Sequence, residues 1–312
     1  MFRKKILGLL IFLLSFNIFG ETLKVLTPDG LPALSLAKMM TNVHEIDGNK
    51  VEYKIEKLSD ALVVDMLKRE GDIAIVPSNF AAQLYNKKLG YKILGTVGWG
   101  SFYVISRENI DSLEELKGRE IYTFGKGLTP DIIFESILKS KGIEKKDIKI
   151  NYLSSGNEVA ALYLGKKADI VVVPEPILSK ILSKSLGTNV ISNLNEEWKN
   201  LVNSDLGYPQ STLVIKEEVY NSNPKLVDEF VSQLKTSVAS LYKNRDESIK
   251  YIQNSSISVD TSILDSILSR ANILYTPILD CQEEYNRYFK VLNEVNSKVI
   301  GGKIPNEEIY AK

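Results

Sequence analysis

One stretch of this sequence occurs twice, and the repeat constrains the fold more than any other feature. Residues 72–90 read DIAIVPSNFAAQLYNKKLG and residues 169–187 read DIVVVPEPILSKILSKSLG, and the two align without a gap. Each copy begins with Asp-Ile and a branched apolar run, has Pro at the same position, and continues with a helical pattern. Each therefore predicts a buried strand that turns sharply into a helix. A chain with the same α/β unit in both halves most simply forms two similar lobes with a cleft between them.

The order of elements around the repeat supports this organisation. Strand and helix patterns alternate in both halves, which predicts for each lobe a mostly parallel sheet flanked by helices. Two segments, Gly98-Trp99-Gly100 before FYVIS and Gly207-Tyr208-Pro209-Gln210 before STLVI, are expected to be two hinge crossings. We expect the chain to enter the second lobe near Arg107. Lobe I then comprises residues 21–106 and 207–312, and lobe II comprises residues 107–206.

The two ends of the chain carry separate expectations. Residues 1–5 are basic, and residues 6–16 form an apolar run that is too short to span a bilayer comfortably. Residues 1–20 thus have the layout of a Sec-type signal peptide, which predicts a periplasmic or other extracytoplasmic protein, anchored if the segment is not cleaved. The tail after Gly301 is polar and is expected to be loose.

Composition excludes several classes of function. Lysine and arginine number 39, as do aspartate and glutamate, so no basic surplus is available to hold nucleic acid. One cysteine, Cys281, and one histidine, His44, remove most metal sites and most Ser-His or Cys-His catalysis. No motif presents a nucleophile together with a base. We expect no catalytic residue, no metal site and no cofactor.

Polar or glycine-rich turns follow the strands that would face the cleft, at residues 27–30, 78–79, 125–129 and 154–157. In open parallel sheets, ligands lie beyond the carboxyl ends of the strands, where helix N-termini offer unpaired N–H groups. These serines and glycines could also serve only as helix caps and turn formers. The aromatic residues of the crossings could stack on a planar ligand or could be ordinary packing residues.

Several phrases of the chain have a counterpart in a known family. The most specific are Leu-x-x-Leu-Lys-Gly at 113–118, which opens the second lobe, and Asp-Ile-x-x-x-Pro-Glu-Pro at 169–176. The chain resembles the type II periplasmic substrate-binding proteins of ABC importers, specifically the nitrate, sulfonate, taurine and thiamine-pyrimidine group, over nearly all residues after 20. The resemblance implies a two-lobed fold that closes over a ligand. The ligand-binding candidates, from the turns and the resemblance, are Asp29, Gly30, Ser78, Asn79, Trp99, Gly127, Thr129, Ser155, Glu175 and Tyr208.

The resemblance implies a solute receptor that captures a small organic nutrient and delivers it to an ABC permease. We expect a monomer, and a solute that is either sulfonate-like or pyrimidine-like. The acids Asp29 and Glu175 beside aromatic residues favour a planar, nitrogen-bearing molecule. The alternative is an enzyme on the same fold, of the menaquinone-pathway or pyrimidine-synthase kind, and a third class is an exported sensor or adhesin. The signal peptide and the lack of a histidine-based site weigh against the enzyme.

Overall fold

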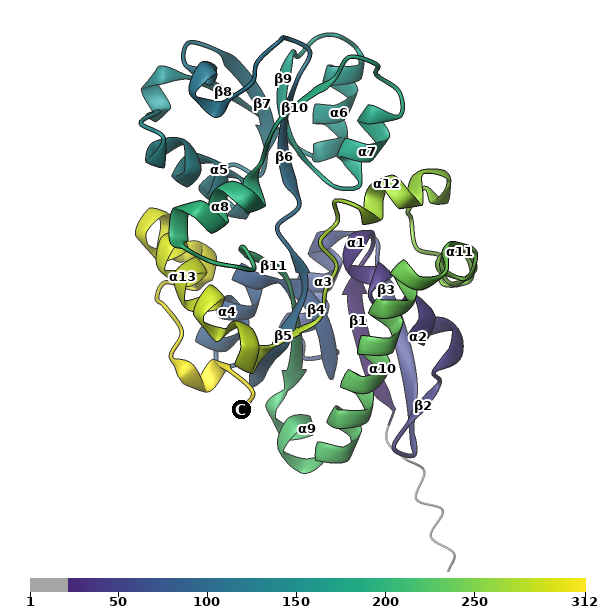
Figure 1. Ribbon diagram of the computed structural model, residues 1–312. Helices are drawn as coiled ribbons and strands as arrows, with labels where there is room; N and C mark the ends of the chain where they lie inside the picture. The colour runs from purple at the N-terminus through teal and green to yellow at the C-terminus, as the bar shows by residue number, and fades with distance from the viewer. Residues whose placement is uncertain (1–21) are drawn as a thin grey trace, which may run out of the picture.

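The computed structural model of this protein describes residues 22–312, so the predicted signal peptide lies outside the described residues. Figure 1 shows two lobes, each built on a twisted sheet flanked by helices, with only a few chain segments running between them. One sheet has seven strands in the order β12-β5-β11-β4-β1-β3-β2, and the other has five in the order β10-β6-β9-β7-β8. The predicted two-lobed α/β fold is confirmed.

The lower lobe in Figure 1 contains the first and last parts of the chain. Its strands are β1 (Leu23–Pro28), β2 (Glu45–Ile46), β3 (Asn49–Glu56), β4 (Ile73–Pro77), β5 (Tyr91–Trp99), β11 (Pro209–Lys216) and β12 (Thr276–Pro277). Its helices are α1 (Leu31–Leu34), α2 (Ala37–Asn42), α3 (Ser59–Leu67), α4 (Ser78–Asn86), α9 (Glu217–Ser222), α10 (Pro224–Lys243), α11 (Arg245–Asn254), α12 (Leu264–Leu268) and α13 (Ile278–Asn296).

The upper lobe is formed by the middle of the chain. Its strands are β6 (Phe102–Ser106), β7 (Glu120–Phe124), β8 (Lys149–Leu153), β9 (Ile170–Pro174) and β10 (Asn189–Asn193). Its helices are α5 (Thr129–Ser140), α6 (Gly156–Leu164), α7 (Ile177–Leu182) and α8 (Leu194–Val202).

The repeated stretch occupies equivalent places in the two lobes. The first copy forms β4 and α4, and the second forms β9 and α7, as the sequence predicts. β4 lies between a parallel neighbour, β1, and an antiparallel neighbour, β11. β9 likewise lies between parallel β7 and antiparallel β6. The branched apolar runs are fully buried because each copy supplies a strand in the middle of its sheet.

The first crossing lies earlier in the chain than the sequence suggested. β6 was expected in lobe I because the entry into lobe II was placed near Arg107. Instead β6 pairs antiparallel with β9 and β10 of the five-stranded sheet. The crossing is therefore at Gly100 and Ser101, and β6 enters its sheet in the same way as β11 enters the other sheet after the return crossing.

The two lobes share an apolar contact on one flank, at the left of Figure 1, where α13 of lobe I meets α5 and α8 of lobe II. The ring of Tyr288 on α13 lies 6.4 Å from that of Trp198 on α8, at an interplanar angle of 68°. Both side chains are buried in one cluster with α5 residues such as Ile133. The lobes are thus joined by a continuous core on this flank.

The C-terminal tail was expected to be loose, and this expectation is wrong. Ile309, Tyr310 and Ala311 are buried, and Ile309 and Tyr310 belong to the same apolar cluster as α13. The N–H of Ala311 donates to the carbonyl of Ile93, so the tail adds to the edge of β5 beyond the short strand β12. Three apolar side chains within a polar segment were enough to dock it.

Candidate interlobe ligand site

A cavity of about 200 Å³ lies where the two lobes meet. Its walls come from the turn after β1, the end of β5, the first crossing, the turn after β9, the start of β11 and the segment between α12 and β12. The lining residues are Asp29, Gly30, Leu31, Pro32, Val97, Gly98, Trp99, Ser101, Phe102, Pro174, Glu175, Pro176, Gln210, Ser211, Ala271 and Ile273. The cavity is therefore at the carboxyl ends of β1, β5 and β9, where ligands of open α/β sheets bind.

Four of the ten predicted site residues line this cavity: Asp29, Gly30, Trp99 and Glu175. They come from both lobes, although they are far apart in the sequence. The other six, Ser78, Asn79, Gly127, Thr129, Ser155 and Tyr208, are not among its lining residues.

Asp29 is held by groups of its own lobe. One carboxylate oxygen accepts hydrogen bonds from the backbone N–H of Gly30 at 2.8 Å and of Ser258 at 2.9 Å. The other accepts from Nζ of Lys57 at 2.8 Å. Burial raises the pKa of Asp29, but these hydrogen bonds outweigh it and hold the pKa below its usual value. Asp29 therefore fixes the turn after β1, and Gly30 is needed there because its φ is 91°.

Trp99 ends β5 and has its polar groups satisfied within lobe I. Its indole Nε1 donates to Oγ1 of Thr276 at 3.3 Å, and its backbone N–H donates to the carbonyl of Asn272 at 3.0 Å. With both N–H groups engaged, the side chain can offer a cavity only its apolar surface. Phe102, directly after the crossing, also lines the cavity, so the walls carry aromatic surface from both sides of the hinge.

Glu175 has a fully buried side chain at the start of the turn after β9. Its carboxylate accepts hydrogen bonds from Oγ of Ser179 at 2.9 Å and from Nε of Arg270 at 2.7 Å. Burial raises the pKa of this carboxyl above its ordinary value, while the hydrogen bonds from Arg270 and Ser179 act in the opposite direction. Glu175 and Arg270 form a charged pair between lobe II and lobe I.

Ser78 belongs to a buried hydrogen-bond network inside lobe I. Its hydroxyl lies 2.6 Å from that of Thr212, which lies 2.7 Å from the hydroxyl of Tyr285, which in turn lies 2.8 Å from that of Thr96. The network connects α4, α13 and strands β11 and β5. Ser78 is thus placed as a structural residue.

Tyr208 is fully buried at the return crossing. Its ring packs edge-on against Trp198, with centroids 5.9 Å apart. It also lies so close to Gly100 that a Cβ there would be 2.3 Å from Cε1 of the ring. Tyr208 therefore packs the two crossings together. Of the two roles considered for this residue, ligand stacking and ordinary packing, the contacts support packing.

Two further candidates make local or tail contacts. Nδ2 of Asn79 donates to the carbonyl of Val299 at 3.2 Å, which holds the turn after α13 on α4. Ser155 is the N-cap of α6, and its hydroxyl accepts from the backbone N–H of Glu158 at 3.3 Å. Capping accounts for Ser155 without a ligand.

Gly127 and Thr129 lie on the flank where the lobes are packed together. The N–H of Gly127 donates to Asp131 at 2.7 Å, and its carbonyl accepts from Asn296 of α13 at 3.3 Å. The hydroxyl of Thr129 lies 2.9 Å from that of Tyr288 on α13. Both residues join lobe II to α13.

Sequence reasoning missed two residues next to the cavity. Gln210 lines it, and its Oε1 accepts from the backbone N–H of Ser101 at 2.9 Å, which links the two crossings. The apolar spacing of residues 262–274 predicts a helix that would contain Arg270, but α12 ends at Leu268 and Arg270 lies in the turn directly after it. The one available signal for Arg270 was that it is the only cation between Lys250 and Arg287 in the sequence.

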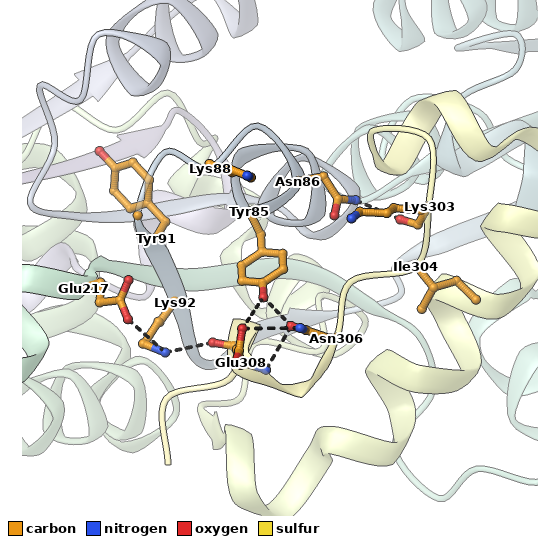
Figure 2. Close-up of a pocket in the computed structure, with 11 residues that line it drawn as sticks. Tyr85, Asn86, Lys88, Tyr91, Lys92, Glu217, Lys303, Ile304, Asn306 and Glu308 are labelled. Carbon is orange, nitrogen blue, oxygen red and sulfur yellow. Dashed lines mark hydrogen bonds and ion pairs between the residues drawn. The ribbon is translucent and has the colours of Figure 1, made fainter.

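A larger hollow of about 720 Å³ lies on the outer surface of lobe I. Figure 2 shows its walls, which come from the end of α4, the start of β5 and the C-terminal tail. Its polar groups are engaged with one another: Lys92 lies 3.4 Å from a carboxylate oxygen of Glu217 and donates to the carbonyl of Glu308. It has walls from one lobe alone, so the interlobe cavity remains the better candidate despite its smaller volume.

Within residues 22–312, no His, Cys, Asp or Glu residues gather in a group of three or more that could bind a metal ion. In the same part of the chain, no helix combines the length and apolarity that crossing a membrane requires.

Comparison with known proteins agrees with this architecture. The model of the family described as NMT1/THI5 like matches residues 97–248. A search of curated proteins gives no match.

Solved structures give extensive matches. An ABC transporter structure from Parabacteroides distasonis is 24% identical, with 93% of this chain and 99% of that chain covered and a TM-score of 0.79. The periplasmic aliphatic sulphonate binding protein SsuA from Escherichia coli is 15% identical, with 94% and 92% covered and a TM-score of 0.75. The periplasmic nitrate-binding protein NrtA from Synechocystis PCC 6803 is 14% identical, with 78% and 69% covered and a TM-score of 0.56. The chain therefore has the two-lobed fold of periplasmic binding proteins of the type II class, and its resemblance to the sulfonate, nitrate and NMT1/THI5-like group is confirmed.

Proposed function

We propose that this protein is the extracytoplasmic solute-binding component of an ABC importer. The observation that carries the proposal is the interlobe cavity, which has walls from both lobes and from the first crossing. A molecule bound there would contact both lobes at once, so its binding favours the closed arrangement over the open one. The closed form is what a permease would recognise. The matched solved structures described by function are binding proteins, which supports this reading over an enzyme on the same fold.

The domain assignment follows from the two sheets. We propose lobe I as residues 22–99 with 209–312, lobe II as residues 102–206, and the hinge as the two short crossings between them. Residues 1–20 are proposed as a Sec-type signal peptide, and a single copy of the chain is proposed as the working unit. The likeness to periplasmic proteins supports an extracytoplasmic location.

The lining of the cavity favours a neutral or positively charged organic solute. Among the described residues that line it there is no lysine or arginine, whereas Asp29 and Glu175 are both present. A nitrate or sulfonate ion would find no free cation in the walls, because Lys57 and Arg270, which lie next to the cavity, are already paired with Asp29 and Glu175. Trp99 and Phe102 supply apolar surface for a flat ring. These features support a small planar molecule, nitrogen-bearing rather than strongly anionic.

A thermal-shift screen with purified protein tests the function. Only a compound that binds the native state raises the melting temperature, so the panel should include vitamin precursors, amines, sulfonates and nitrate. We expect stabilisation by a neutral or cationic ring compound and none by nitrate. Stabilisation by nitrate or sulfonates alone would contradict the solute class. Turnover of a compound by the purified protein would contradict the binding function.

Calorimetry on the best compound then tests the site. We expect Trp99→Ala to weaken binding by about tenfold or more, because it removes an aromatic wall of the cavity. Leu186→Ala is the control, because Leu186 is 99% exposed in a loop of lobe II. Equal affinities in the two variants would remove Trp99 from the site.

A further inference from the structure

Arg270 makes contacts from one lobe to the other on the flank opposite the apolar contact. It lies in the segment between α12 and β12, and its neighbours Ala271 and Ile273 are buried in the core of lobe I. The segment runs beside the first crossing at the centre right of Figure 1, below α7. Nδ2 of Asn272 donates to the carbonyl of Gly100 at 2.6 Å and fixes the segment against the crossing. Arg270 is thus mounted on lobe I.

The side chain of Arg270 reaches two residues of lobe II. Nε lies 2.7 Å from a carboxylate oxygen of Glu175, and Nη2 donates to Oγ of Ser179 at 2.8 Å. The backbone carbonyl of Arg270 also accepts from the hydroxyl of Tyr103 on β6 at 3.0 Å. One residue of lobe I therefore holds the turn after β9, helix α7 and strand β6 together through the two donors of a planar guanidinium and one carbonyl.

The two flanks differ in how they can respond to rotation of the lobes. On the α13 flank the lobes share buried aromatic packing through Tyr288 and Trp198, which resists separation. On the Arg270 flank the contacts are polar, and water can replace them when the lobes part. Glu175 is fully buried with its partner in place, so loss of the guanidinium leaves a buried carboxylate with no cation beside it.

A second set of charges on the same flank also favours contact between the two lobes. Asp260, in lobe I ahead of α12, has its pKa lowered by hydrogen bonds from Ser262 and additionally by the charges of Lys184 and Lys180. These two lysines belong to the α7 region of lobe II. Charges of opposite sign on the two lobes therefore attract each other on this flank.

We propose that Arg270 is a latch that sets the equilibrium between open and closed lobes, and so tunes solute affinity, without touching the solute. The inference rests on the proposed function, because a latch matters to affinity only if closure accompanies binding. Glu175 gives the latch its link to the site, because its carboxylate is shared between the ion pair and the wall of the cavity. A closed arrangement that is stabilised before binding raises affinity by the same factor as it raises the closed population.

The test measures the lobes with and without solute. Spin labels at Leu58→Cys in lobe I and Leu186→Cys in lobe II, which are 71% and 99% exposed, report the interlobe distance by pulsed electron resonance. The native Cys281 is buried and burial raises its pKa to about 12, so it does not compete for the label. We expect Arg270→Gln to shift the solute-free distribution to longer distances. Arg270→Lys keeps the positive charge but lacks the two-donor geometry of the guanidinium. Its distance distribution should lie between those of the unsubstituted protein and Arg270→Gln.

Affinity is measured by calorimetry with the best compound from the screen. We expect Arg270→Gln to weaken binding by about tenfold and Arg270→Lys to recover part of the loss. Arg245→Gln is the matched control, since Arg245 pairs with Asp265 on the exposed surface of lobe I.

The outcomes separate the latch from the function. A distance distribution in Arg270→Gln that equals that of the unsubstituted protein overturns the latch, even if solute still binds. An altered distribution with unchanged affinity also overturns it. If no compound binds, the proposed function fails, while the solute-free distances still decide whether Arg270 holds the lobes. If Arg270→Gln does not fold, Arg270→Lys carries the same test.

Discussion

Substitution of Gly100 by alanine tests the packing of the two crossings. A Cβ at this position would lie 2.3 Å and 2.4 Å from Cε1 and Cζ of Tyr208, and 2.5 Å from Oδ1 of Asn195. Uncrowded heavy atoms sit about 3.5–4.0 Å apart, so the crossings would have to separate by roughly 1 Å. Overpacking of this kind costs about 1–3 kcal/mol. We expect Gly100→Ala to fall near the upper value, because atoms of two elements would have to move.

Thermal and urea unfolding measure the effect. In a protein of this size, each kcal/mol corresponds to about 2 °C in Tm, so Gly100→Ala should lower the Tm by about 6 °C. Gly98→Ala, two residues earlier at the end of β5, is the control, because its Cβ would come no closer than 3.3 Å, and only to the side chain of Ser211.

A second-site variant makes the test specific to the ring. In a Tyr208→Leu background the overlaps with the Tyr208 ring are gone and only the overlap with Oδ1 of Asn195 remains, so the alanine should cost less there. Gly100→Ala and Gly98→Ala with the same Tm would refute the packing argument. So would a Gly100→Ala cost that does not depend on the Tyr208 ring.

Two further predictions concern the tail and the turn after β1. Ile309→Ala should lower the free energy of unfolding by about 3 kcal/mol, because the side chain is fully buried, whereas the exposed Lys303→Ala should have little effect; urea unfolding decides, and equal midpoints would mean that the tail is not docked. Asp29 has a folded-state pKa below its usual 3.8, so its contribution to stability is present above that pH and is lost as the pH falls through the lower folded value. Asp29→Asn should therefore destabilise the protein at pH 7 and lose most of that effect toward pH 2; a difference from the unsubstituted protein that is constant with pH would contradict the role of Lys57.

The sequence predicts the lobes well because the signal for them is local. Each copy of the repeat combines a buried strand, a proline and a helix, and these contacts form within one stretch of chain. The sequence analysis placed β6 in the wrong lobe, although the similarity of the two halves of the chain gives its correct place. STLVI was placed in the lobe that follows its crossing, and the same reasoning applied to FYVIS moves β6 into lobe II.

The site is less predictable because its members meet only through the tertiary fold. Trp99 was predicted from its place at the first crossing and Glu175 from the Pro-Glu-Pro phrase at the end of a strand, and both line the cavity. Arg270 could not be placed, because its partner is 95 residues away and its helix was expected to continue. For Tyr208 the sequence left two roles open, stacking on a ligand and packing within the protein. Only its close approach to Gly100 in the folded structure favours packing.

The order of strands has a consequence for how the chain acquires its structure. β4 and β5 are consecutive along the chain, yet β11 is inserted between them, so the larger sheet keeps an unfilled slot until residue 216 has been made. The smaller sheet has a similar insertion, of β9 between β6 and β7, but all five of its strands lie between residues 102 and 193, so a much shorter stretch of chain completes it. Long-range pairing of this kind slows folding and leaves strand edges exposed in the interim. Lobe II, formed by the middle of the chain, can thus fold before the two parts of lobe I that flank it in the sequence pair with each other.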